Sequence, residues 1–146
     1  MGLDPSQLIE RALVERQKDD YDQVWCVFDR NSWPAQNFNS ALVQARRNKI
    51  RVAYSNEAFE LWYLLHFHYY DTGIQRQQYI QILEGLLGHP YAKNSATTYD
   101  ELRSRQEDAL HNARSLLAQY NPPDPANDNP STTVHLLVEE LLRFAR

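Results

Sequence analysis

The chain has 146 residues, of which 42% are apolar and 12% aromatic, and this composition excludes wholesale disorder. Its formal charge of −4 at pH 7 gives no general attraction to nucleic acid, so any such affinity must come from a local patch. The single cysteine, Cys26, excludes an internal disulfide, and we expect it to be buried like a small hydrophobe. Neither a signal peptide nor a membrane-spanning stretch is present in this sequence, so we expect a cytoplasmic protein that does not use a membrane.

The first half of the chain predicts helices and strands in alternation. A helix is expected over about 5–18, because an aspartate can cap it and apolar residues recur at helical spacing. The apolar stretch 24–28 predicts a strand buried on both faces, and it ends at Asp29. A helix over about 37–48 and a strand over 50–54 follow. This order implies a right-handed crossover between two parallel strands.

A third helix is expected to begin at Ser55 or Asn56, either of which can cap it, and to continue through Phe67. This segment is apolar nearly all round, which predicts a buried helix. Glu60 lies inside it and therefore needs a partner, because a buried carboxylate without one is costly. At i and i+4, Asn56 and Glu60 would share one face of this helix.

The second half of the chain is predicted to be helical. Helices are expected over 76–87, ending at Gly88, and over 98–120, followed by a stiff proline-rich loop over 121–130. Ser131 is expected to cap the last helix. The core side of that helix is expected to carry Val134, Leu137, Val138, Leu141 and Leu142. We interpret residues 1–146 as one domain, with an α/β part over 1–67 and a helical part over 76–146.

Polar side chains gather where the first predicted strand ends. Asp29 and Asn31 would share one face of an extended strand, and the helix carrying Asn56 and Glu60 begins just after the neighbouring strand. Oxygen ligands of this kind suit Mg²⁺ or Mn²⁺. The same residues also fit a structural role, with Asp29 capping a loop and Glu60 paired with an arginine.

Basic residues offer a second functional hypothesis. Arg46 and Arg47 lie in the last turn of the predicted helix over 37–48, where cations offset the negative end of the helix dipole. The alternative role of Arg46 and Arg47 is contact with phosphate. Arg30, which directly follows Asp29, is a further candidate for such a contact. Other site types are absent from the sequence, which has neither a glycine-rich phosphate loop nor a second cysteine for a thiolate zinc site. His66 and His68 are two residues apart, so on a helix they point in different directions.

Four stretches of the sequence resemble the RloB family. They are Val-Trp-Cys-Val-Phe-Asp-Arg over 24–30, Ile-Arg-Val-Ala-Tyr-Ser-Asn over 50–56, the segment 59–67 that begins Phe-Glu-Leu-Trp, and Asn-Pro-Ser-Thr-Thr-Val-His over 129–135. The resemblance covers almost the whole chain and keeps the family order. RloB proteins are bacterial, were named for genes found within restriction–modification loci, and are associated with defence against phage. The family resembles the Toprim fold of metal-dependent nucleases and topoisomerases, which use a glutamate after the first strand and an Asp-x-Asp pair after a later one.

The resemblance implies an α/β fold in which helices flank a small, parallel, Toprim-like sheet, with a helical C-terminal half. It also implies nucleic-acid processing that depends on Mg²⁺ or Mn²⁺. Asp29 matches the first aspartate of the pair and Asn31 stands where the second would be, so this ligand carries no charge. The expected catalytic residues are Asp29 and Glu60, and the expected metal ligands are Asp29, Asn31 and Glu60. The expected phosphate contacts are Arg30, Arg46 and Arg47, and Asn56 and His66 are expected to support the site.

The family carries a strand with a Glu-Gly-Glu type motif before the region matched here, whereas this sequence begins at the segment that matches the family's Gly-x-Asp-Pro. We therefore expect part of the active site to be missing from this chain. The alternative function is a non-catalytic interaction subunit that assembles with a nuclease or restriction system. The expected partners are nucleic acid, and either a second copy of the chain or a defence-system protein, because an unpaired sheet edge favours association.

Overall fold

A three-stranded sheet lies at the centre of the computed structural model, which describes residues 3–31 and 33–145. The strands are β1 (Trp25–Asp29), β2 (Arg51–Asn56) and β3 (Ser131–Thr132), in the order β1–β2–β3. β1 and β2 run parallel, as predicted, with Asp29 beside Ser55. β3 runs antiparallel to β2, so the sheet is mixed and the prediction of a purely parallel sheet is wrong.

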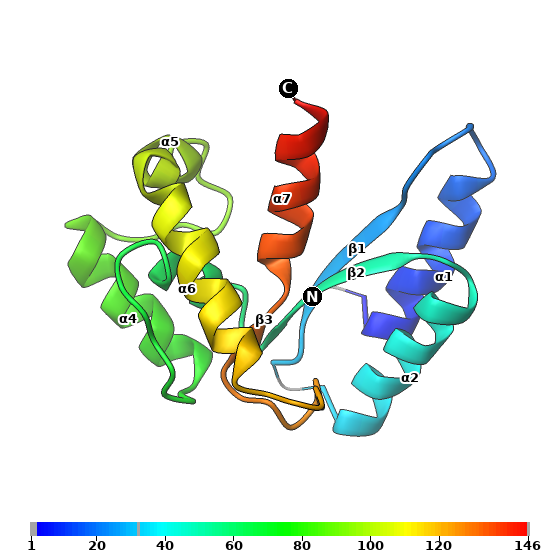
Figure 1. Ribbon diagram of the computed structural model, residues 1–146, viewed down its shortest axis with the longest axis horizontal. Coiled ribbons are helices and arrows are strands. Elements are labelled where there is room, and N and C mark those ends of the chain that lie inside the picture. Colours follow the sequence, from blue (N-terminus) through cyan, green and yellow to red (C-terminus); the bar gives the residue numbers. More distant parts are fainter. Residues whose placement is uncertain (1–2, 32, 146) are drawn as a thin grey trace.

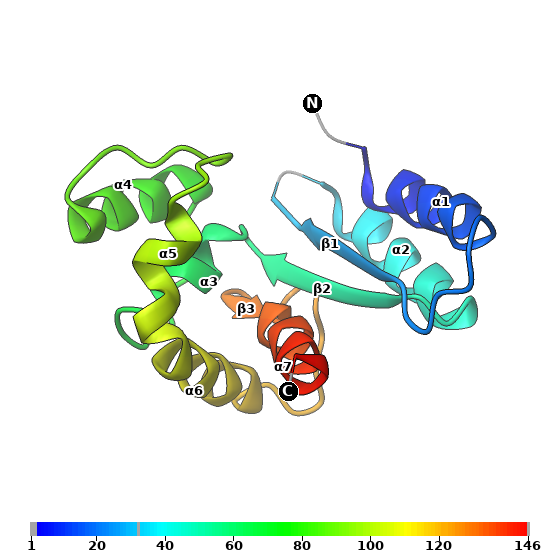
Figure 2. The ribbon, with the colours of Figure 1, turned by 90° about the horizontal axis from the view of Figure 1, so that it is seen from above.

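Helices cover both faces of this sheet (Figure 2). On one face, α1 (Pro5–Arg16) and α2 (Ala35–Arg47) pack against each other and against the side of β1 that carries Cys26. On the other face lies α7 (Val134–Phe144), which contacts β2. The capping box of α1 begins at Asp4, whose carboxylate accepts from the Gln7 N–H, and this bond fixes the predicted start of the helix.

The remaining helices gather beyond the carboxyl end of β2 (Figure 1). They are α3 (Glu60–Leu64), α4 (Arg76–Leu87), α5 (Thr98–Leu102), the 3₁₀ turn η1 (Arg103–Arg105) and α6 (Gln106–Ala118). Their apolar faces enclose a core that includes Leu61, Leu64, Leu65, Tyr79, Leu83, Ala113 and Leu116. α4 has the predicted bounds and ends at Gly88, whose φ of +79° is a backbone conformation that glycine adopts without strain. The single helix predicted over 98–120 is divided by the 3₁₀ turn.

The third helix differs most from its prediction. Ser55 and Asn56 belong to β2 rather than to a helix, because they pair with Thr132 and Ser131 of β3. α3 therefore begins at Glu60 and is only five residues long. Ser131 does not cap α7 either, since it lies in β3 and its hydroxyl donates to the Asp128 carbonyl at 2.7 Å. The Val134 N–H at the start of α7 instead donates to Thr132 Oγ1 at 3.2 Å.

Two predictions of burial are also corrected. β1 is an edge strand and is not buried on both faces, because the Val27 side chain is 42% exposed. Leu141, expected on the core side of α7, is 61% exposed. Across residues 3–31 and 33–145, none of the helices combines the length and the apolar character needed to cross a bilayer.

Candidate functional site

A cavity of about 930 Å³ opens beside the carboxyl end of β1. Four of its lining residues are charged or polar, namely Asp29, Asn31, Arg76 and Lys93. Asp29 and Asn31 come from the end of β1, whereas Arg76 begins α4 and Lys93 lies in the loop after α4. The cavity therefore lies between the sheet and the helical part of the chain, and one carboxylate and two cations line it together.

Asp29 is the acidic group of this cavity. Its Oδ2 accepts a hydrogen bond from the Phe59 N–H at 3.3 Å, which ties the end of β1 to the segment that leads into α3. Partial burial raises the pKa of Asp29, and the negative charge of Glu60 adds to this effect. The Phe59 hydrogen bond and the positive charges of Arg76 and Lys93 act in the opposite direction. A bound cation would relieve the cost of ionising this carboxyl.

Asn31 lines the cavity for a different reason from the one predicted. β1 ends at Asp29, so Asn31 does not continue the alternation of an extended strand. Its φ of +39° lies in the left-handed region, which asparagine tolerates better than most residues. Its N–H donates to the Glu57 carbonyl at 2.7 Å. This turn, rather than strand geometry, places Asn31 beside Asp29.

Glu60 is buried and paired, which confirms the prediction that it needs a partner. Its side chain is 1% exposed, and its Oε1 accepts from Arg76 Nε at 3.2 Å and from Arg76 Nη2 at 3.1 Å. Its second oxygen, Oε2, is buried without a hydrogen-bond partner in the described parts of the chain. Glu60 does not line the cavity, so its geometry suits the positioning of Arg76 better than direct contact with a ligand.

Asn56 and His66 do not line the cavity that contains Asp29. Asn56 is buried at the end of β2, where its Nδ2 donates to the carbonyls of Pro125 and Ala126, both at 3.1 Å. Since Asn56 lies in a strand, it does not share a helical face with Glu60. It instead holds the proline-rich loop against the sheet.

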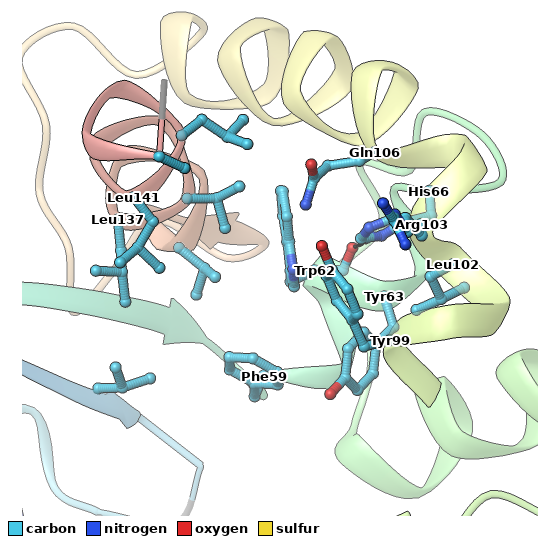
Figure 3. Close-up of a pocket in the computed structure, with 15 residues that line it drawn as sticks. Phe59, Trp62, Tyr63, His66, Tyr99, Leu102, Arg103, Gln106, Leu137 and Leu141 are labelled. Carbon is cyan, nitrogen blue, oxygen red and sulfur yellow. Dashed lines mark hydrogen bonds between the residues drawn. The ribbon is translucent and has the colours of Figure 1, made fainter. Parts of the chain in front are cut away.

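His66 lines a second, apolar cavity of about 500 Å³. Its Nδ1 lies 2.9 Å from the Trp62 carbonyl, and the two side-chain rings are 4.8 Å apart. Figure 3 shows Trp62 between Leu137 and Leu141 on one side and Tyr99 on the other. His66 therefore belongs to an aromatic cluster rather than to the charged cavity.

The predicted phosphate contacts are not brought together. Arg46 and Arg47 end α2, which leads into the amino end of β2, so they lie at the opposite end of the sheet from Asp29. Arg30 follows Asp29, but its Nε is buried with no hydrogen-bond partner in residues 3–31 and 33–145. The cations beside Asp29 are Arg76 and Lys93, which the sequence analysis missed. The signal for Arg76 was the buried Glu60, which required a cationic or hydrogen-bonding partner nearby.

The described residues contain no group of three or more His, Cys, Asp or Glu side chains able to hold a metal ion. Asp29 and Asn31 offer one charged and one neutral oxygen ligand in the same cavity. Mg²⁺ commonly binds through one or two protein carboxylates and completes its shell with waters and substrate phosphates. The donor set therefore fits a weakly held divalent ion whose coordination a phosphate completes.

A family model described as RloB-like protein matches residues 2–141, which is nearly the whole chain. The chain belongs to the RloB-like family. No curated protein and no solved structure matches it. The resemblance found in the sequence is thus confirmed. In this RloB-like chain the cavity is lined from both halves, since Asp29 precedes α2 and Lys93 follows α4.

Two buried histidines predict a loss of stability in mild acid for this RloB-like protein. Burial lowers the pKa of His66 and of His135 below the ordinary value of 6.5. A group with a depressed folded-state pKa stabilises the fold above its unfolded-state pKa, and this stability is lost as the pH falls. We expect the free energy of unfolding to decline from pH 7 to pH 5, with a limiting slope of about 1.4 kcal/mol per pH unit for each histidine.

Urea denaturation at several pH values measures this slope, with His66→Gln and His135→Gln as variants that do not titrate. Each variant should flatten the decline. A wild-type stability that is constant over this pH range would contradict the prediction. His111→Gln is the matched control, because His111 is an exposed histidine on α6.

Proposed function

We propose that this RloB-like chain is a Toprim-like protein that processes nucleic acid with a divalent cation, in bacterial defence against phage. The observation that carries the proposal is the cavity at the carboxyl end of β1, which Asp29, Arg76 and Lys93 line together. In open α/β sheets, ligands bind in the crevice beyond the carboxyl ends of the strands. A carboxylate beside two cations suits a phosphodiester, since a metal ion and the cations can share its negative charge.

The residues in and beside the cavity have different roles in such a site. Asp29 and Asn31 would hold Mg²⁺ or Mn²⁺, which neutralises phosphate oxygens and provides or orients a hydroxide when bound. Arg76 and Lys93 bind the phosphate oxygens, and the planar guanidinium suits two oxygens at once. Glu60 keeps Arg76 in place through the two hydrogen bonds to its Oε1. We therefore assign Glu60 a positioning role rather than contact with the substrate.

Binding of a labelled oligonucleotide, measured by fluorescence anisotropy with Mn²⁺ and with a chelator, tests the proposal. Wild type should bind more tightly with Mn²⁺ than with the chelator, and Asp29→Ala should lose this difference. Asp20→Ala is the matched control, because Asp20 is an exposed aspartate in the segment before β1. If wild type binds no nucleic acid, or if Asp29→Ala behaves like wild type, the proposal is wrong.

Adding a charge at Asn31 should strengthen metal binding. Asn31→Asp places a second carboxylate in the cavity beside Asp29, and affinity for hard cations rises with the charge of the ligands. We expect Mn²⁺ to bind about tenfold more tightly, an order of magnitude that reflects one added charged ligand. Calorimetry with Mn²⁺ on wild type and Asn31→Asp measures the change. Asn39→Asp, at an exposed position of α2, is the control for a general gain of negative charge.

A second candidate function is a non-catalytic subunit that assembles with a nuclease or restriction system. The apolar cavity of about 500 Å³ favours it, because exposed apolar side chains border this cavity on α7 and α5. Leu141 is 61% exposed and Tyr99 is 60% exposed, and such patches often mark interaction surfaces. Light scattering over a dilution series tests self-association. We expect an assembly that Leu141→Glu dissociates, and a wild-type monomer at micromolar concentration would count against a homo-oligomer.

A further inference from the structure

The cavity beside Asp29 has an aromatic wall as well as a charged one. Phe28, Trp33 and Phe59 line it together with the charged groups described above. Recognition of a phosphate requires positive charge and N–H donors, but it requires no aromatic surface. Aromatic side chains beside a basic surface are instead typical of proteins that bind single-stranded nucleic acid, because bases stack on them. The aromatic residues in the wall of the cavity therefore indicate that the ligand includes a base as well as a phosphate.

The three aromatic residues are held in different ways. Phe28 packs edge-on against Phe38 at 5.7 Å between ring centroids, and Phe59 packs in the same way against Tyr63 at 5.2 Å. Trp33 lies in the turn between β1 and α2, where its N–H donates to the Arg30 carbonyl at 2.8 Å, and its side chain is half-buried. Trp33 thus combines a large flat surface with a backbone that is fixed next to Asp29 and Asn31.

The cations of the cavity keep the capacity to bind a ligand. Glu60 binds Nε and Nη2 of Arg76, which leaves Nη1 available, and the Arg76 side chain is 30% exposed. Lys93 is exposed and makes no ion pair within the described part of the chain. Lys93 lines the same cavity as Asp29 and Arg76. A phosphate next to Arg76 and Lys93 would therefore lie close to the metal-binding oxygens of Asp29.

The size and the aromatic lining of the cavity indicate whether it binds single-stranded or double-stranded nucleic acid. A volume of about 930 Å³ lies within the range of pockets that enclose small organic ligands, and it can hold one nucleotide. In a duplex the bases are stacked inside the helix, so they reach an aromatic wall only after being flipped out at an energetic cost. An unpaired base reaches the wall without that cost. The aromatic wall therefore favours the binding of a single strand over the binding of a duplex.

We infer that the cavity takes one unpaired nucleotide of a single-stranded nucleic acid, with its base on Trp33 and its phosphate on Arg76 and Lys93. This inference rests on the proposed function and names the substrate class of the same site. It assigns Trp33 as a residue that determines specificity, separate from Asp29. The neighbouring nucleotides lie outside the cavity, so the cavity distinguishes single-stranded from double-stranded nucleic acid rather than one long sequence from another.

Fluorescence anisotropy on the intact chain tests the inference, with a short labelled single strand and a duplex of the same sequence, in Ca²⁺ to avoid cleavage. The variants are Trp33→Leu, which removes the flat surface, and Trp33→Phe, which keeps an aromatic ring. Tyr99→Leu is the matched control, because Tyr99 is an exposed aromatic residue at the other cavity. Thermal melting verifies that each variant is folded.

Wild type should bind the single strand more tightly than the duplex, and Trp33→Leu should weaken single-strand binding by roughly 5- to 100-fold. Trp33→Phe should recover most of this loss, and Tyr99→Leu should bind like wild type. Equal affinity for both forms, or unchanged binding by Trp33→Leu, overturns the inference while the Asp29→Ala result can still support the proposed function. Absence of binding to either form overturns both.

Discussion

Replacing Arg76 with methionine is expected to lower the free energy of unfolding by roughly 3–5 kcal/mol. Glu60 is 1% exposed, and its Oε1 accepts two hydrogen bonds from Arg76, at 3.2 Å and 3.1 Å. Removal of the guanidinium leaves this carboxylate inside the protein without its counter-charge, and a buried unpaired charge is far more costly than a missing contact. Methionine keeps an apolar stem of similar length, so the measured loss reports mainly on the charge. Chemical denaturation at pH 7 measures it.

The double variant Glu60→Gln with Arg76→Met should recover much of this stability, because neither partner then carries a charge. Arg114→Met is the matched control, since Arg114 pairs with Glu139 at 2.9 Å but is 56% exposed. Exposed pairs of this kind contribute about 0–1 kcal/mol. If Arg76→Met costs no more than Arg114→Met, the carboxylate of Glu60 is not buried as the structure has it. The single variant Glu60→Gln measures the change in the free energy of unfolding that follows from the loss of the Glu60 charge alone, with Arg76 still present.

Elements that depend on local chemistry could be predicted from the sequence. The bounds of α4 were predicted correctly, because its apolar spacing and Gly88 act over a few neighbouring residues. The parallel pair β1–β2 was also predicted, because a strand, a helix and a strand in succession have one common arrangement. The same local logic correctly demanded a partner for Glu60. It did not identify Arg76 as this partner, because Arg76 comes from another helix.

Contacts between distant segments account for the errors. β3 is two residues long, so it has no periodicity that a sequence analysis can detect. Its pairing nevertheless extends β2 through Asn56 and shortens α3, because Ser55 Oγ and Thr132 Oγ1 form a hydrogen bond of 2.9 Å. One long-range contact therefore changed the predicted secondary structure of two segments. The helical half of the chain also supplies part of the sheet, which the sequence pattern did not indicate.

The candidate site was predicted in part for the same reasons. Asp29 and Asn31 follow a strand, and the structure places both at one cavity. Lys93 carries no sequence marker, because it lies in a loop whose position depends on how α4 packs. Arg46 and Arg47 formed a more visible cluster, but α2 runs back along the sheet and carries them to the far end. A charge pattern in sequence shows which residues are basic, whereas tertiary packing decides which of them meet a carboxylate.

Tyr79 belongs to the core of the helical part of the chain, and its truncation should have the second large effect. Tyr79 is fully buried in α4, three residues after Arg76, and its ring lies 6.0 Å from that of Tyr70. Replacing a buried aromatic side chain with alanine removes its apolar contacts and leaves a cavity, which costs about 3–5 kcal/mol. We expect Tyr79→Ala to lose this much free energy of unfolding in urea denaturation. Gln81→Ala, at an exposed position of the same helix, should change it little.

The variant Tyr79→Phe separates packing from hydrogen bonding. Its ring fills the same space, and it loses a long hydrogen bond of 3.4 Å to the Thr72 carbonyl, so its cost should stay near 1 kcal/mol. Oligonucleotide binding by folded Tyr79→Ala should also fall, because α4 holds Arg76 against Glu60 and loses one of its two buried side chains, Tyr79 and Leu83. Wild-type affinity in a strongly destabilised Tyr79→Ala would show that Arg76 is held by its ion pair alone. Binding that falls in step with stability, across Tyr79→Phe and Tyr79→Ala, would show that the packing of α4 sets the geometry of the cavity.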